Sequence, residues 1–464
     1  MGPEQLNAIL FEQIKKQNAL IAVQADRIAA LEAELREWKS GSVGPTNRQR
    51  RRVKGAKPAK DQPKSDKPRP AGRKKGHKGS GRKKPKTVDV VESHRLDSCP
   101  DCSGNLIDKG VGHRHLVEDI VLTVETTQYD LHRHHCPACQ TDHQAPLPQH
   151  LGGPVRIGPS ALALAAWMRL DMRQSIGNIA RFFTEGIGLS WSKGSISQRL
   201  CSLMETLEPV TEKLWEDLQD EPVVHVDETG WREDGFRRWM WNGSGQKTSC
   251  FHITDGRDRE SFEEVIRSFF PGIVVTDGYT AYHGIPADQH AGCWAHILRK
   301  ARDAWEVHQQ PADHAVLVSI QRFLRGARWY RASHPDDLAS QRPFLLKAFD
   351  EIVRVSGLAS TPRLVKQGRW LSKRRSRYLL FLNHEAVPLT NNQAERELRG
   401  AVIMRRTSFG GRNHRGNRTL ADGMTIIRSL AKRGASWFEF IPRALQSIAV
   451  GDLPVIGPLP AGCR

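Results

Sequence analysis

Three acidic residues stand where predicted elements of regular structure end or begin. Asp227 and Asp277 each close a short β-branched, apolar run that is typical of a buried strand. Glu395 lies in the helix-like segment 391–399. Carboxylate oxygens are the ligands that Mg²⁺ and Mn²⁺ prefer. Two strand-end aspartates and a later helical glutamate therefore predict a site for two such ions, suited to in-line displacement at phosphorus.

A second glutamate, Glu397, competes with Glu395 for the third position. The two are separated by about 200° around a helix, so both cannot face one site. Arg399 shares the face of Glu395 and is expected to hold a DNA phosphate beside it. This pairing favours Glu395 as the third ligand.

The elements that must position the aspartates lie in residues 221–295. The pattern predicts strands over 223–228, 237–242, 249–254 and 273–277, with a helix over 258–270. Three strands, a helix and a further strand match the front of a ribonuclease H-like fold. In that fold the first and fourth strands are neighbours, so their carboxylates lie side by side.

Residues 296–388 are predicted to be a helical insertion, and 389–450 the remainder of the catalytic core with C-terminal helices. The insertion carries a basic stretch that includes Lys373, Arg374 and Arg375. These three are candidate contacts to the DNA backbone, and a solvated helix face is the alternative.

Residues 89–150 predict a zinc-ribbon-like domain. Two Cys-x-x-Cys pairs frame it, with a ribbon strand expected over 116–125 between them. Four thiolates complete a tetrahedral site without an open position, so the Zn²⁺ is expected to be structural. The proposed ligands are Cys99, Cys102, Cys136 and Cys139.

Other residues near the acidic motifs are expected to be structural. His225 shares the side of the strand that carries Asp227, and Glu228 points to the opposite side. Cys293 and His296 could form half of a metal site, but no second pair lies nearby in the sequence. A buried cysteine and a helix-start histidine that position the site are the favoured interpretation.

Three further segments precede the core. Residues 1–40 show a heptad stripe that predicts a coiled coil and self-association, with a single amphipathic helix as the alternative. Residues 41–88 predict a disordered linker, rich in Lys and Arg, that attracts phosphates. Residues 151–220 have the helix, glycine turn and serine-capped helix of a helix-turn-helix unit, a pattern that any helical hairpin shares.

The length of the chain agrees with several domains, and its net charge agrees with a polyanion partner. The chain has 464 residues and a formal net charge of +19. Neither a secretory signal nor a transmembrane run is visible, so a cytoplasmic, nucleoid-associated protein of bacterial type without membrane contact is expected.

Several motifs resemble transposases of the insertion-sequence sixty-six family, a branch of the DDE transposases. They occupy 225–230, 276–282, 290–300 and 391–399. The resemblance implies a multidomain α/β protein with a ribonuclease H-like core and an α-helical insertion. It also places the catalytic triad on Asp227, Asp277 and Glu395.

The resemblance further implies hydrolytic nicking at element-end inverted repeats, which exposes 3′-hydroxyls that then join to target DNA. Double-stranded DNA is the expected partner, with accessory transposition proteins as further candidates. A domesticated DNA-binding protein without catalysis is the competing interpretation. A tyrosine or serine recombinase, which would form a covalent protein–DNA adduct, is a second.

Overall fold

The computed structural model describes residues 87–147, 157–266, 270–333 and 338–457. Contacts divide the chain into two units, Met1–Glu118 and Asp119–Arg464, and each is described by itself. The predicted coiled coil over 1–40 and nearly all of the predicted linker over 41–88 lie outside the described residues. In the described part of the chain, no helix is both long and apolar enough to cross a membrane.

The cysteine-rich region contains one small hairpin. Strands β1 (Arg133–Cys136) and β2 (Thr141–Gln144) pair antiparallel. The strand predicted over 116–125 is wrong, because these residues have no regular structure. Its β-branched side chains, including Val117 and Val121, are exposed. A run of β-branched residues forms a strand only when a neighbouring strand satisfies its backbone groups, and no strand among the described residues pairs with this run.

Five helical segments follow, and they include the predicted helical hairpin. Its first helix, α4, is capped by the Ser175 side chain, which accepts a hydrogen bond from the Asn178 amide. Its second helix, α5, is capped in the same way by Ser192. The segments are α3 (Pro159–Leu170), α4 (Ile176–Arg181), the π-helix η2 (Phe182–Gly186), α5 (Lys193–Thr206) and α6 (Glu208–Gln219).

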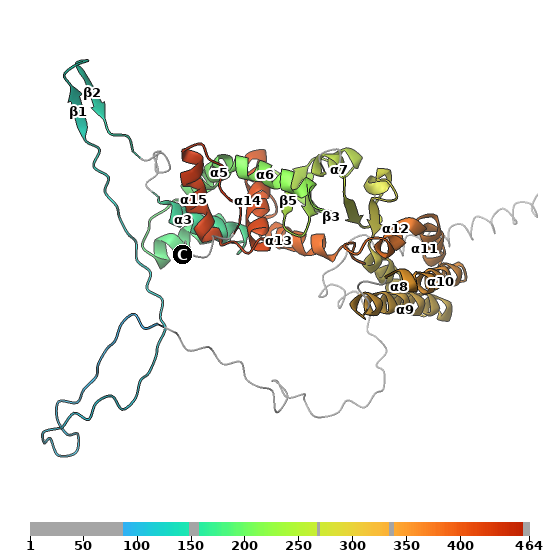
Figure 1. Ribbon diagram of the computed structural model, residues 1–464, viewed down its shortest axis with the longest axis horizontal. Coiled ribbons are helices and arrows are strands. Elements are labelled where there is room, and N and C mark those ends of the chain that lie inside the picture. Colours follow the sequence, from blue (N-terminus) through green and yellow to red (C-terminus); the bar gives the residue numbers. More distant parts are fainter. Residues whose placement is uncertain (1–86, 148–156, 267–269, 334–337, 458–464) are drawn as a thin grey trace, which may run out of the picture. The chain divides into compact units, whose positions relative to one another are not determined.

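A mixed sheet of five strands forms the centre of the second unit (Figure 1). Its order is β5-β4-β3-β6-β7, with β3, β4 and β5 antiparallel and β6 and β7 parallel to β3. The strands are β3 (Val223–Glu233), β4 (Phe236–Ser244), β5 (Ser249–Thr254), β6 (Ile273–Thr276) and β7 (His290–Gly292). The four predicted strands are confirmed, and β7 is an addition.

Short helices connect the strands, and longer helices form the segment that was predicted as an insertion. Helix α7 (Arg259–Val265) precedes β6, and the 3₁₀ turn η3 (Thr280–Gly284) follows it. After β7 come α8 (Trp294–His308), α9 (Pro311–Ser333), α10 (Leu338–Gly357), α11 (Pro362–Lys373), α12 (Arg375–Leu379) and the turn η4 (Leu380–Leu382).

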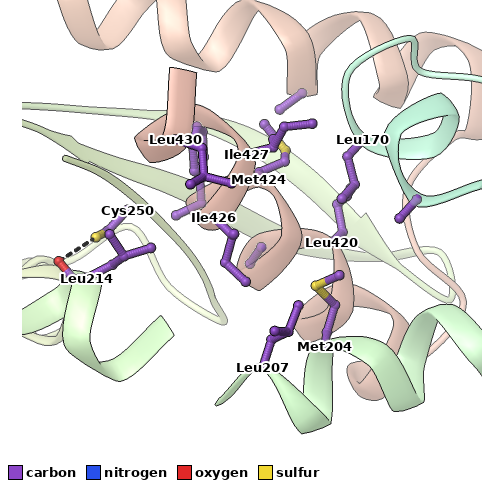
Figure 2. Close-up of a cluster of buried hydrophobic side chains, with 14 of the residues drawn as sticks. Leu170, Met204, Leu207, Leu214, Cys250, Leu420, Met424, Ile426, Ile427 and Leu430 are labelled. Atoms are coloured by element: carbon purple, nitrogen blue, oxygen red, sulfur yellow. Dashed lines mark hydrogen bonds between the residues drawn. The ribbon is translucent and has the colours of Figure 1, made fainter. Parts of the chain in front are cut away.

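The final helices return to the sheet. Helix α13 (Asn392–Ser408) contacts β3 and β4, and α14 (His414–Lys432) lies against β5. Helix α15 (Trp437–Ala449) packs on α3. Figure 2 shows apolar side chains of α14, such as Met424 and Leu430, among those of α3, α5 and α6. Burial of this many apolar side chains is the main favourable contribution to folding here.

The sheet separates two hydrophobic cores. Val224, Val226 and Val274 belong to the core that α14 helps to fill. Val223 and Val275 instead belong to a second core, built with the helices of the insertion. Both faces of β3 and β6 are therefore buried, which explains their continuous apolar runs.

Candidate active site

The two aspartates lie at corresponding positions of neighbouring parallel strands. The pairing of β3 with β6 ends with His225 opposite Val275. Two residues further on, β3 reaches Asp227, and Asp277 follows directly after the last residue of β6. Because side chains alternate along a strand, this shared register puts both carboxylates on the same side of the sheet. The placement agrees with the sequence prediction that these strands are neighbours.

Glu395 approaches from the first turn of α13. The residue before this helix, Asn391, is fully buried and fixes the start of the helix to β3. Its Nδ2 donates a hydrogen bond to the Val226 carbonyl at 2.7 Å, and its Oδ1 lies 2.9 Å from His225 Nδ1. Burial lowers the pKa of His225 to about 4, so the imidazole is neutral at pH 7. His225 is a hydrogen-bonded structural residue, as the sequence predicted.

The segment before α8 is attached at the same point. The Asn391 amide donates to Cys293 Sγ at 3.1 Å, and the Trp294 amide donates to the Leu389 carbonyl at 3.0 Å. Cys293 is buried, and burial raises the pKa of its thiol. These bonds tie the beginnings of α8 and α13 together next to β3, which supports a positioning role for Cys293.

The carboxylates interact electrostatically. Burial raises the pKa of Asp227 well above its usual value. The negative charges of Glu228, Asp277 and Glu395 raise it further. Closely spaced carboxylates without a cation disfavour one another's ionised forms. This concentration of negative charge is what a divalent cation would relieve.

Glu395 has one oxygen that accepts no hydrogen bond within the described residues. Its Oε1 is buried without a hydrogen bond, although His296 Nε2 is 3.8 Å away. Its Oε2 lies 3.8 Å from an Arg299 guanidinium nitrogen. His296 also has a buried Nδ1 without a hydrogen bond. Buried polar atoms are usually satisfied, so these two mark a place suited to a ligand.

The donor atoms fit a hard cation, but they are not gathered into a closed cage. In the described ranges, no group of three or more His, Cys, Asp or Glu side chains is placed to hold a metal ion. Mg²⁺ usually keeps several waters and is bound through one or two carboxylates together with substrate phosphate. Asp227, Asp277 and Glu395, which are close enough to interact electrostatically, are compatible with that kind of binding.

A buried arginine supports the loop that carries Asp277. Arg377 of α12 donates to the Asp277 carbonyl and to Thr276 Oγ1, the latter at 3.0 Å. Thr276 Oγ1 also lies 2.8 Å from His290 Nε2. The Tyr279 amide donates to Asp277 Oδ1 at 2.7 Å. In the sequence Arg377 is one of several basic residues, and nothing in that pattern distinguishes it as buried.

The neighbouring glutamates have other partners. Glu228 is buried and binds Arg257 and the Tyr282 hydroxyl. Glu397 forms an ion pair with Arg428, whose Nε is 2.6 Å from Glu397 Oε2. The prediction that Glu395 and Glu397 point to different places is confirmed.

The four candidate DNA contacts lie on the surface or close to it. Arg399 and Lys373 are exposed. The Arg374 guanidinium lies 3.5 Å from the centre of the Trp370 ring. Arg375 forms a two-pronged ion pair with Asp350, which makes it less available to phosphate than the other three.

Both cysteine pairs have unpaired thiols. Backbone amides of Asp101 and Cys102 lower the pKa of Cys99. Hydrogen bonding, above all from Thr141, lowers the pKa of Cys139 to about 7. A lowered thiol pKa favours the thiolate form that binds metal. The two pairs belong to different units of the chain.

The mixed five-stranded sheet with its many helices defines an α/β protein. The chain belongs to the IS66 family of transposases, whose family model matches residues 154–419. The match spans the helical hairpin, the sheet, the insertion, all of α13 and the first turns of α14. The resemblance noted in the sequence is thereby confirmed.

Two relatives come from Sinorhizobium fredii (strain NBRC 101917 / NGR234). The uncharacterized protein y4qI is 25% identical over 243 residues, which cover 46% of this chain and 44% of y4qI. The uncharacterized protein y4hP is 23% identical over 394 residues, covering 73% of this chain and 69% of y4hP. The chain thus matches less than half of the first relative's length.

Proposed function

We propose that this chain is a DDE transposase in which Asp227, Asp277 and Glu395 hold two Mg²⁺ or Mn²⁺ ions. The strand order β5-β4-β3-β6-β7, with one helix before β6, supports a ribonuclease H-like core. The observation that carries the proposal is the register of β3 with β6, which aligns Asp227 with Asp277. The electrostatic coupling of Asp227 with Glu395 adds the third acid.

The substrate proposed is double-stranded DNA at the inverted repeats that end the element. When bound, a pair of divalent ions activates the attacking oxygen and stabilises the leaving one at a phosphodiester. The three acids orient the reacting groups, and Asn391 and Arg377 keep the acids in register through the bonds described above. A first hydrolytic cut exposes a 3′-hydroxyl, and the same site then joins that hydroxyl to target DNA.

The remaining parts of the proposal concern regions away from this site. Cys99, Cys102, Cys136 and Cys139 hold one structural Zn²⁺, and residues 1–40 associate two or more copies. The basic segment 41–88 and the helical hairpin bring DNA to the core. Accessory transposition proteins complete the set of partners, and the complex works on the nucleoid in the bacterial cytoplasm.

The deciding experiment compares two neighbouring glutamates. The intact chain, Glu395→Gln and Glu397→Gln are incubated with labelled element-end duplex in Mg²⁺ or Mn²⁺. Glu395→Gln should lose nicking and keep DNA binding in a gel shift. Glu397→Gln should keep nicking, because its carboxylate serves an ion pair within the fold. Nicking by Glu395→Gln at the rate of the intact chain would refute the assignment.

Asp227→Ala and Asp277→Ala extend the test to the other two acids. Each should abolish nicking while binding of the duplex remains. The product of the intact chain should carry a 3′-hydroxyl and no attached protein. A covalent protein–DNA adduct on a denaturing gel would instead indicate a recombinase with a protein nucleophile.

A further inference from the structure

The tip of the β3–β4 hairpin and the turn between α13 and α14 form one rigid joint. The Asp234 amide donates to the Gly411 carbonyl at 3.0 Å, and the Gly411 amide donates to the Arg232 carbonyl at 2.9 Å. Gly410 has a φ of 113°, and a Cβ there would lie 2.4 Å from the Arg232 carbonyl oxygen. Only glycine fits so close an approach, so the turn has a fixed shape.

This joint presents an aromatic side chain to solvent. Phe409 is 79% exposed and has a φ of 59°, in the left-handed region. Bulky residues rarely adopt this conformation, which persists only where the surroundings impose it. Phe236, at the hairpin tip, is 67% exposed. Both side chains are therefore available for contact with another molecule.

The surroundings of these aromatics are basic. Arg232, Arg406 and Arg412 are exposed on the same joint. The hairpin tip also carries two acids: Glu233, which lies 3.7 Å from the Arg238 guanidinium, and the exposed Asp234, so the three arginines outnumber the acids there. Arginines interleaved with exposed aromatics are typical of surfaces that bind nucleic acid. A positive surface of this kind is poorly suited to a second copy of a chain with net charge +19.

The joint stands at a fixed distance from the acids. Strand β3 carries Asp227 and then Arg232, which at about 3.3 Å per residue are about 17 Å apart. Helix α13 carries Glu395, and Phe409 follows its last residue, so at about 1.5 Å per residue these two are about 21 Å apart. Two independent elements thus give similar spacings, equivalent to about five or six base pairs of B-DNA.

We propose that Phe409 and the arginines of this joint contact DNA about five or six base pairs from the phosphodiester at the acids. Phe409 stacks on a base or enters a base step, and Arg232, Arg406 and Arg412 bind the flanking phosphates. This inference rests on the proposed function and adds a second, spaced contact to it.

The test uses the full chain carrying Glu395→Gln, so that DNA is bound but not cut. The probe is a labelled duplex with the terminal repeat of the element, studied by hydroxyl-radical footprinting and fluorescence anisotropy. Phe409→Ala should weaken binding about 5- to 100-fold and remove protection about five or six base pairs from the cleavage position. Leu358→Ala, which truncates another exposed apolar residue, should change neither measurement.

A second variant separates contact from folding. Phe409→Gly relieves the left-handed backbone, so its melting temperature should rise while its DNA affinity falls as in Phe409→Ala. Arg412→Gln should lower the salt dependence of binding by about one counterion. Unchanged affinity and footprint in Phe409→Ala would overturn the inference.

The outcomes also distinguish this inference from the proposed function. If Glu395→Gln binds the duplex and Phe409→Ala in that background keeps the full footprint, the joint is not a DNA contact and the transposase proposal stands. If Glu395→Gln binds no element-end DNA, the transposase proposal and the inference about the joint are both wrong. If Phe409→Ala alters self-association without changing DNA binding, the joint contacts another copy and the inference is wrong.

Discussion

Replacing Asn391 with alanine should damage both stability and catalysis, because this side chain joins α13 to β3. The change removes the bond to the Val226 carbonyl at 2.7 Å and the bond to His225 at 2.9 Å. Asn391 is fully buried, so water cannot replace it without rearrangement. Two lost bonds and the unsatisfied groups left behind predict a loss of about 2–4 kcal/mol in the free energy of unfolding.

Catalysis should suffer beyond this loss of stability. Glu395 lies one turn beyond Asn391, and a helix start that is free to shift misplaces its carboxylate relative to Asp227. A displacement of about 1 Å can lower a reaction rate by about 100-fold. Nicking should therefore be measured at a temperature where the variant is fully folded, so that the rate reports geometry alone.

The matched control is Asn392→Ala, which changes the exposed neighbour of Asn391. Urea unfolding of the intact chain and both variants gives the free energies, and single-turnover nicking gives the rates. Asn392→Ala should stay within about 0.5 kcal/mol of the intact chain, as surface substitutions usually do. The reasoning fails if Asn391→Ala unfolds at the same urea concentration as Asn392→Ala.

Three further predictions concern separate parts of the fold. Gly410→Ala should cost at least about 1–3 kcal/mol in urea unfolding, because of its positive φ and the carbonyl it meets, whereas Gly194→Ala in open space within α5 should stabilise slightly. Burial raises the pKa of Asp422 to about 6, so its folded form binds more protons than its unfolded form. Stability of the intact chain should then fall, relative to Asp422→Asn, by up to about 3 kcal/mol as pH rises from about 4 to 6, and parallel unfolding curves would contradict this. Arg377→Met should lower the nicking rate more than DNA affinity, because it frees the loop of the second aspartate without removing a surface charge; equal losses of rate and affinity would argue for a direct DNA contact.

Local patterns predicted most of the sheet and the three acids, since these depend on short-range signals. Alternating or continuous apolar runs marked β3, β4, β5 and β6, and a glycine turn followed by a serine cap marked the hairpin of α4 and α5. The failed strand over 116–125 shows the limit of such signals, because strand propensity is expressed only with a partner strand. The three residues of β7 were too few to give a period.

Long-range contacts account for what the sequence could not predict. The bonds of Asn391 to His225 and Val226 join parts of the chain more than 160 residues apart. Arg377 is buried beside residues a hundred positions earlier, whereas the basic residues at 373–375 are exposed or only partly buried. The exposure of Phe409 depends on a turn that docks on a distant hairpin. No periodicity within one segment reports contacts of this kind.

The bond between the Trp294 amide and the Leu389 carbonyl means that the inserted helices leave and rejoin the core at a single point. A segment whose ends already meet can be lengthened, shortened or exchanged at little entropic expense to the rest of the fold. The number of residues between Asp277 and Glu395 can therefore change without changing the distance between the two side chains. Related proteins are better compared through the segments around Trp294 and Leu389 than through the number of residues between the acids.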